Sequence, residues 1–175
     1  MTPQISDMQT VLERLESRQA DVGIGGSPPG GRLAGYPLVG NDLLVVAKEE
    51  PADLATAPWL LREEGSGTRL ATERLLADLG LGTGGGSAPE LLTLGSNGAI
   101  KQGLAVGLGV TLISRFAVAR ELREGTLTEL AVPGTPLNRP WHVLFPQASL
   151  SRPAPRALGD FLQSAACRKI IENLL

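Results

Sequence analysis

The chain lacks the residue types from which most metal sites and disulfides are made. Its 175 residues include one cysteine, Cys167, and one histidine, His142. A single cysteine excludes an internal disulfide and a zinc site built on cysteine pairs, and a single histidine excludes a site with several histidine ligands. We therefore expect no metal and no cofactor. Cys167 is expected to be buried in a C-terminal helix, and His142 to have a structural role in a strand.

Aromatic residues and long apolar runs are also scarce. Aromatics make up 3% of the chain, so leucine, valine, isoleucine and alanine must build the core. No segment approaches the run of about 18 apolar residues that a membrane span needs. Residues 1–7 contain neither a basic region followed by an apolar stretch nor a lipid-anchor cysteine. This pattern predicts a cytoplasmic protein that does not contact a membrane.

Charge balance and length restrict the class of protein further. A net charge of −2 and a pI near 5.5 argue against a surface made for nucleic acids. A hydrophobic content of 42% excludes a disordered chain. The length allows one sizeable core or two small lobes.

The apolar residues alternate between strand and helix patterns along the chain. Short apolar runs predict strands at 21–24, 43–47, 58–61, 91–94, 110–113, 127–130 and 141–145. Helical spacing predicts helices at 7–18, 68–79, 100–108 and 114–124, and one final helix after Pro155. The segment 27–35, rich in proline and glycine, is predicted to be a loop. The alternation indicates an α/β fold with parallel or mixed sheets.

Three of the expected strands end in turns made of glycine, serine and other small polar residues. The turns contain Gly25 and Gly26, then Ser66, Gly67 and Thr68, then Ser96 and Asn97. In open α/β sheets, ligands bind at the carboxyl ends of strands, where helix N-termini offer N–H groups and favour an anion. The alternative is that Ser66 or Thr68 only caps the helix that follows.

The common enzyme motifs are incomplete in this chain. A nucleophile elbow needs glycine two residues before its serine, and Glu64 and Leu94 stand at those positions. The dinucleotide-binding pattern fails at Pro28, and the phosphate-loop pattern fails because Arg69 follows no Gly-Lys pair. Glu63 and Glu64 are neighbours that would face opposite sides of a strand, so we expect solvated charges rather than an acid/base pair. These failures predict that the chain is not an enzyme.

The order and spacing of the pieces resemble the effector-binding domain of LysR-type transcriptional regulators. The matching stretches, in chain order, are 11–15, 20–26, 43–47, 59–69, 96–110, 112–114, 125–127 and 139–141. Together they cover nearly the whole chain in the family's order. The run Ser-Asn-Gly-Ala-Ile-Lys-Gln at 96–102 is similar to members that regulate carbon fixation and sulfur or nitrogen assimilation. An acid or a phosphorylated metabolite fits that resemblance.

The resemblance implies a type 2 periplasmic-binding-protein-like fold, with two α/β lobes joined by two crossover strands near 47–58 and 141–145. One lobe would hold residues 1–50 and 142–175, and the other residues 51–141. The family's inducers are small metabolites, often anionic, that bind in the cleft between the lobes.

The family's ligand contacts, carried over by the resemblance, map here to Ser66, Gly67, Thr68, Ser96, Asn97 and the turn of Gly25 and Gly26. The hydroxyl groups of Ser66 and Thr68 would donate hydrogen bonds to the anionic end of the ligand. Ser96 and Asn97 would do the same from a second helix start. Arg69 has two possible roles: a charge at the surface, or a counter-ion for the ligand.

Two parts of the family's pattern are not in this sequence: the winged helix-turn-helix with its linker helix, and the first strand and helix of the domain itself. We therefore expect an N-terminally truncated domain, incomplete in its first lobe, that reaches DNA only through the absent part. An exposed sheet edge predicts compensating association, and the family forms homo-oligomers, with a dimer or tetramer expected for the full-length form. Two rivals share the fold, a solute-binding protein of a transporter and a prephenate-dehydratase-like enzyme.

Overall fold

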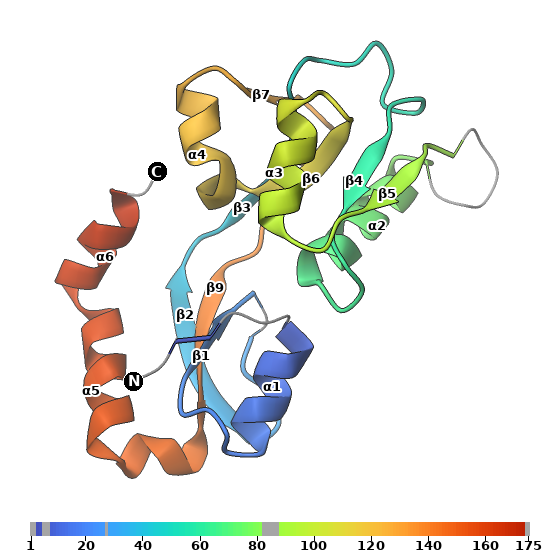
Figure 1. The fold of residues 1–175 in the computed structure, drawn as a ribbon. Coiled ribbons are helices and arrows are strands. Elements are labelled where there is room, and N and C mark those ends of the chain that lie inside the picture. Colours follow the sequence, from blue (N-terminus) through green and yellow to red (C-terminus); the bar gives the residue numbers. More distant parts are fainter. Residues whose placement is uncertain (1–2, 5–7, 27, 82–87, 174–175) are drawn as a thin grey trace. The chain divides into compact units, whose positions relative to one another are not determined.

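The computed structural model describes residues 3–4, 8–26, 28–81 and 88–173 (Figure 1). Its helices are α1 (Met8–Glu16), α2 (Gly67–Asp78), α3 (Asn97–Ala105), α4 (Arg115–Arg123), α5 (Pro153–Gln163) and α6 (Ala165–Glu172), with a 3-10 helix η1 (Gln147–Ser151). Its strands are β1 (Gly23–Gly25), β2 (Leu33–Val39), β3 (Asp42–Ala47), β4 (Trp59–Leu61), β5 (Leu91–Thr93), β6 (Val110–Ser114), β7 (Thr128–Glu129), β8 (Leu137–Asn138) and β9 (Trp141–Pro146).

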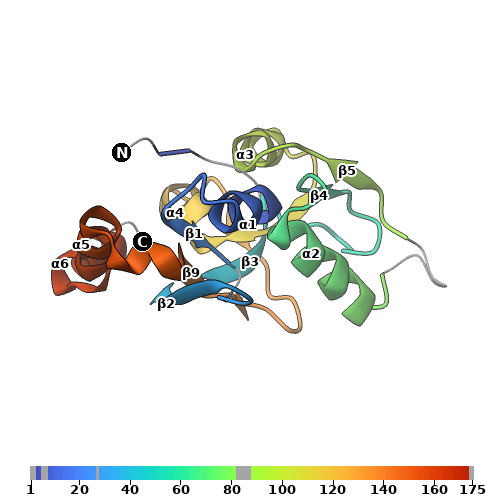
Figure 2. The ribbon, with the colours of Figure 1, turned by 90° about the horizontal axis from the view of Figure 1, so that it is seen from below.

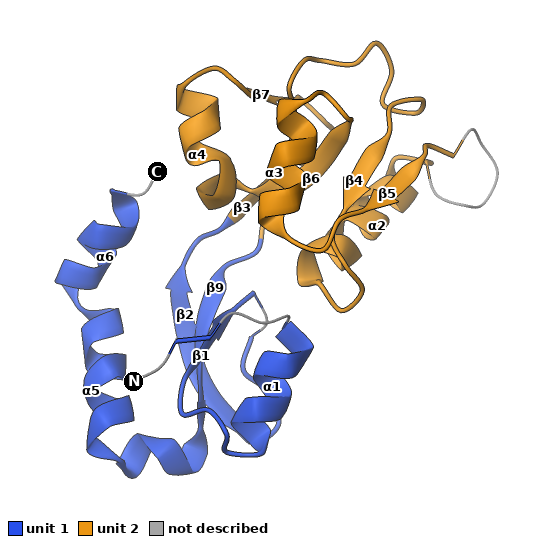
Figure 3. Cartoon of the chain, viewed as in Figure 1, with its two compact units in different colours: residues 1–41, 139–175 blue, residues 42–138 orange. Residues whose placement is uncertain are grey.

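The chain divides into two compact units (Figure 3). Unit 1 consists of Met1–Asn41 and Arg139–Leu175, and unit 2 of Asp42–Asn138. From the sequence, the lobe boundaries were expected after residues 50 and 141. Both boundaries of the compact units fall earlier, after Asn41 and after Asn138. The first does so because β3 pairs with β6, β7 and β8, all of unit 2.

Unit 2 is built on a mixed six-stranded sheet. Its strand order is β5-β4-β6-β3-β7, with β8 added beside β3. Strand β4 runs parallel to β5 and β6, whereas β3 is antiparallel to its three partners. This arrangement matches the mixed sheet expected from the alternation of strands and helices.

Both faces of the unit 2 sheet are covered by helices. Successive residues of β3 point to opposite faces, so Val45 belongs to one apolar cluster and Val46 to another. The first cluster includes Leu75 and Leu76 of α2, and the second includes Ile100 and Leu104 of α3 with Val118 of α4. Figure 2 shows α2 and α3 on different sides of β4. Burying each such leucine stabilises the unit by about 1.5–3 kcal/mol.

Unit 1 contains a three-stranded sheet of order β1-β9-β2 that is antiparallel throughout. Helix α1 covers it, and Leu15 of α1 packs with Leu33 and Leu144 of the strands. The prediction of a loop over 27–35 was wrong at its end, because β2 begins at Leu33. An edge strand tolerates Pro37, which lies at a shift in register between β2 and β9.

The C-terminal segment forms two helices where one was expected. Ser164 has extended backbone angles of φ −71° and ψ 155°, which end α5. Its hydroxyl oxygen then accepts a hydrogen bond from the backbone N–H of Cys167, 3.2 Å away, and caps α6. Cys167 is buried, as expected, and His142 lies buried in β9 opposite Gly25 of β1.

Candidate functional site

The carboxyl ends of β4 and β5 lie side by side at one edge of the unit 2 sheet. The strands pair in parallel, with Trp59 opposite Leu91 and Leu61 opposite Thr93. Five residues separate the end of β4 from the start of α2 at Gly67, and three separate the end of β5 from the start of α3 at Asn97. Two helix N-termini are therefore brought to the same sheet edge, which is an arrangement suited to anions.

Ser66 caps the first of these helices. Its backbone is extended, at φ −71° and ψ 126°, and its Oγ accepts a long hydrogen bond of 3.5 Å from the N–H of Arg69. Gly65 supplies the preceding bend with a φ of 83°, which favours glycine. Ser66 is 8% exposed, so the residue is largely withdrawn from solvent.

Ser96 caps the second helix in the same way. Its Oγ accepts a hydrogen bond of 3.1 Å from the N–H of Ala99. Unlike Ser66, Ser96 is exposed, as are its neighbours Asn97 and Gly98. Ser66 therefore fulfils the capping alternative, and Ser96 caps its own helix as well. Capping does not prevent a serine hydroxyl from donating its own proton to a ligand.

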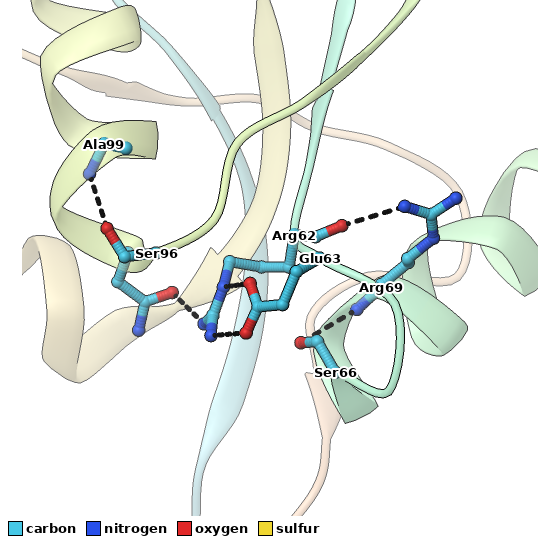
Figure 4. Close-up of polar contacts among 7 residues, drawn as sticks. Arg62, Glu63, Ser66, Arg69, Ser96 and Ala99 are labelled. Carbon is cyan, nitrogen blue, oxygen red and sulfur yellow. Dashed lines mark hydrogen bonds and ion pairs between the residues drawn. The ribbon is translucent and has the colours of Figure 1, made fainter. Parts of the chain in front are cut away.

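Arg62 links the two helix starts, and the sequence did not single it out. Its Nε and Nη2 donate hydrogen bonds to the carboxylate of Glu63, at 2.7 and 2.6 Å. Its Nη1 donates to Oδ1 of Asn97 at 2.6 Å, across to α3. Figure 4 shows Arg62 and Glu63 between the Ser66 turn and the Ser96 turn. The expectation that Glu63 is only a solvated charge was wrong, because the guanidinium group holds it in a bidentate pair.

Arg69 is also fixed at this edge. Its Nη1 donates hydrogen bonds to the backbone oxygen of Arg62 at 3.1 Å and to Oγ1 of Thr93 at 3.2 Å. Its Nε pairs with Glu73, one helical turn along α2, at 2.8 Å. Arg69 thus bridges the ends of β4 and β5 and places a second guanidinium group beside the two helix starts.

The structure gathers the predicted site residues of unit 2 at one edge of its sheet. Those that gather at the edge of unit 2 are Ser66, Gly67, Thr68, Arg69, Ser96 and Asn97. Gly25 and Gly26 belong to unit 1, so their part in the same site stays a prediction. Arg62 could have been found only from its position at the end of β4, one residue before the suspected Glu63.

The described residues offer little to a metal ion. Across 3–4, 8–26, 28–81 and 88–173, no group of three or more His, Cys, Asp or Glu side chains is placed to hold one. In the same part of the chain, no helix combines the length and apolar character needed to cross a membrane. What this edge can do chemically is bind an anion through backbone N–H groups, hydroxyl groups and guanidinium groups.

Comparison with known proteins gives a consistent result. Residues 2–167 match the family model described as the LysR substrate binding domain. The chain is 35% identical over 173 residues to the RuBisCO operon transcriptional regulator of Acidithiobacillus ferrooxidans, covering 93% of this chain and 54% of that protein. It is 32% identical over 170 residues to the HTH-type transcriptional regulator CbbR of Rhodospirillum rubrum, covering 93% and 55%. The chain thus spans about half the length of these curated relatives.

Solved structures share the fold. The regulatory domain of CcmR from Synechocystis PCC6803, in complex with 2-PG, matches with a TM-score of 0.80 and 26% identity, over 92% of this chain and 80% of that one. The effector binding domain of QuiR, in complex with shikimate, matches with a TM-score of 0.72 and 16% identity, over 90% and 77%. At 16% identity, the similarity to QuiR concerns the fold alone.

Proposed function

Because the chain belongs to the LysR substrate-binding domain family, we propose that it senses a small anionic metabolite for a LysR-type transcriptional regulator. The ligand class that fits best is a short phosphorylated acid such as 2-phosphoglycolate. The CcmR regulatory domain, at 26% identity, was solved with 2-PG. Such a ligand carries two anionic groups, and the edge of unit 2 presents two helix starts.

One observation carries this proposal. The parallel register of β4 and β5, with Leu61 opposite Thr93, sets both helix N-termini at one sheet edge. Ser66 and Ser96 stand at those N-termini with their hydroxyl groups fixed by capping bonds. A bound anion would accept hydrogen bonds from hydroxyl and N–H donors and would gain from both helix dipoles.

Sensing requires that the ligand bind one conformation of the regulator more tightly than another. A ligand shifts a two-state equilibrium only by its differential affinity for the two states. We propose that the whole regulator is a homo-oligomer. We also propose that it contacts DNA through a separate part, because the relatives are named as transcriptional regulators and are about twice as long as this chain. We propose no catalytic role, since the relatives carry a regulatory name and the enzyme motifs are incomplete.

The proposal is tested by isothermal calorimetry of the 175-residue chain with 2-phosphoglycolate. We expect saturable binding that weakens about tenfold in Ser66→Ala and in Ser96→Ala, as the loss of a hydrogen bond to a charged group implies. Glycolate and inorganic phosphate, which each carry one of the two anionic groups, should bind more weakly than 2-phosphoglycolate.

Ser164→Ala is the matched control, because Ser164 caps α6 of unit 1 with the same side-chain bond. It should lower stability by about 1 kcal/mol, as the other cap variants do, but leave the affinity unchanged. Equal affinity in wild type, Ser66→Ala and Ser96→Ala would refute the assigned site. A wild-type chain that binds none of the three anions would refute the ligand class.

A further inference from the structure

The guanidinium group of Arg62 is occupied by an anion that belongs to the protein itself. The carboxylate oxygens of Glu63 lie 2.7 Å from Nε and 2.6 Å from Nη2, and Oδ1 of Asn97 lies 2.6 Å from Nη1. Each guanidinium nitrogen therefore has a partner among the described residues. Planar bidentate contact is also the way a guanidinium group binds a ligand carboxylate or phosphate.

The Arg62–Glu63 ion pair lies at the edge of the unit 2 sheet where an anionic effector is proposed to bind. Arg62 directly follows β4 and reaches Asn97, the first residue of α3. The Glu63 carboxylate thus lies at the edge where both helix starts point (Figure 4). An anionic effector bound at this edge would meet the negative charge of Glu63 at short range, where repulsion between like charges is strong.

The Glu63 carboxylate has partial access to water in this position. Its side chain is 31% exposed and that of Arg62 is 20% exposed, so the carboxylate can rotate into water while the guanidinium group stays at the edge. Partly exposed ion pairs contribute little net stability, because water solvates the separated charges well. Asn97 and the stem of Arg62 would keep the guanidinium group in place after Glu63 has left.

From this arrangement we infer that Glu63 is a built-in competitor of the effector. In the unliganded chain it holds Arg62, and an anionic effector must displace it to reach the same guanidinium nitrogens. The inference rests on the proposed function, and it adds Arg62 as a ligand contact and Glu63 as the residue that sets the effector concentration needed for binding. The apparent dissociation constant then equals the intrinsic constant divided by the fraction of chains in which Glu63 has left Arg62.

Glu63→Gln tests the inference directly, because glutamine keeps the shape of the side chain and removes its charge. We expect 2-phosphoglycolate to bind about tenfold more tightly to Glu63→Gln than to wild type, the change expected when the resident anion occupies Arg62 in about nine chains of ten. Arg62→Gln should bind about tenfold more weakly than wild type, as loss of a charge-assisted contact implies.

Glu64→Gln is the control for charge alone. Glu64 adjoins Glu63, is exposed and carries the same charge, and no contact with Arg62 is found for it among the described residues. Its affinity should stay within about twofold of wild type, since exposed charges are well screened. The double variant Arg62→Gln/Glu63→Gln should bind like Arg62→Gln, because the competitor matters only while Arg62 is present.

The possible results separate this inference from the proposed function. Binding that is weakened by Ser66→Ala but is no tighter in Glu63→Gln than in wild type overturns the competitor role alone. A gain in affinity that is equal in Glu63→Gln and Glu64→Gln, or that persists without Arg62, also overturns it. If wild type and Glu63→Gln both fail to bind 2-phosphoglycolate and inorganic phosphate, both proposals fall.

Discussion

Lys101 Nζ lies 2.7 Å from Oε1 of Glu121, so that an ion pair joins α3 to α4 on one face of the unit 2 sheet. The Glu121 side chain is 13% exposed, and its other oxygen, Oε2, is buried without a hydrogen-bond partner among the described residues. Arg120 adds a longer contact of 3.5 Å from a largely exposed position. Lys101 is therefore the main compensation for a carboxylate that is mostly withdrawn from water.

Replacing Lys101 with methionine should destabilise unit 2. The change keeps the length of the stem and leaves the Glu121 carboxylate largely uncompensated, which should lower the free energy of unfolding by about 1–3 kcal/mol. Urea unfolding followed by circular dichroism measures this value. Lys48→Met is the control, because Lys48 is exposed and should change stability by less than about 0.5 kcal/mol. Equal effects of the two substitutions would contradict the role given to the ion pair.

The Lys101–Glu121 ion pair should also make the stability of the protein depend on pH in the acid range. Burial alone would raise the pKa of Glu121, but hydrogen bonds from Lys101 and the backbone, with the charges of Lys101 and Arg120, lower it below the ordinary 4.5. A lowered pKa contributes stability above the unfolded-state value and loses it as pH falls through the folded-state value. Wild type should therefore lose stability below about pH 4.5 more steeply than Glu121→Gln. Parallel acid titrations of the two proteins would contradict this.

Tyr36 should make unit 1 sensitive to alkali. Burial raises the pKa of its hydroxyl above the ordinary 10.0, and the hydroxyl donates a hydrogen bond of 2.9 Å to the backbone oxygen of Gly159 in α5. A raised pKa means that the stabilisation is complete below pH 10 and is lost as pH rises through the folded-state pKa. Tyr36→Phe should cost about 1 kcal/mol at neutral pH and should flatten the alkaline decline in unfolding temperature.

Gly35 should tolerate no side chain. A Cβ at this position would lie 2.1 Å from the backbone oxygen of Val143, which β2 and β9 hold in place by pairing. Gly35→Ala should therefore destabilise unit 1 by about 3 kcal/mol, in the upper range for overpacking. Gly30→Ala is the control, because a Cβ there meets open space. Hydrogen exchange should show lost protection in β2 and β9 and unchanged protection in unit 2.

The sequence predicted the elements whose signals are local. The start of α2 was expected from the small residues between Leu61 and Thr68, and Ser66 does cap that helix. The α/β fold of the type 2 periplasmic-binding-protein kind is confirmed by the family and by its solved relatives. These features were accessible because periodicity and turn chemistry act within a few residues of each other.

Features that depend on distant partners could not be predicted in this way. Strand β2 contains glycine and proline and was taken in part for loop, because only its pairing with β9 makes it a strand. The contact between Arg62 and Asn97 joins residues 35 positions apart and depends on the register of β4 with β5. A pattern along the chain carries no information about such a register.

The order of strands in unit 1 has a consequence for folding during translation. β9 is the middle strand of the sheet β1-β9-β2, yet it is made after the whole of unit 2. During synthesis at about 5–20 residues per second, β1 and β2 leave the ribosome without their shared partner, whereas unit 2 is one continuous segment. Unit 2 can therefore fold while translation proceeds, and the nascent β1 and β2 must avoid pairing with neighbouring chains until residues 141–146 emerge.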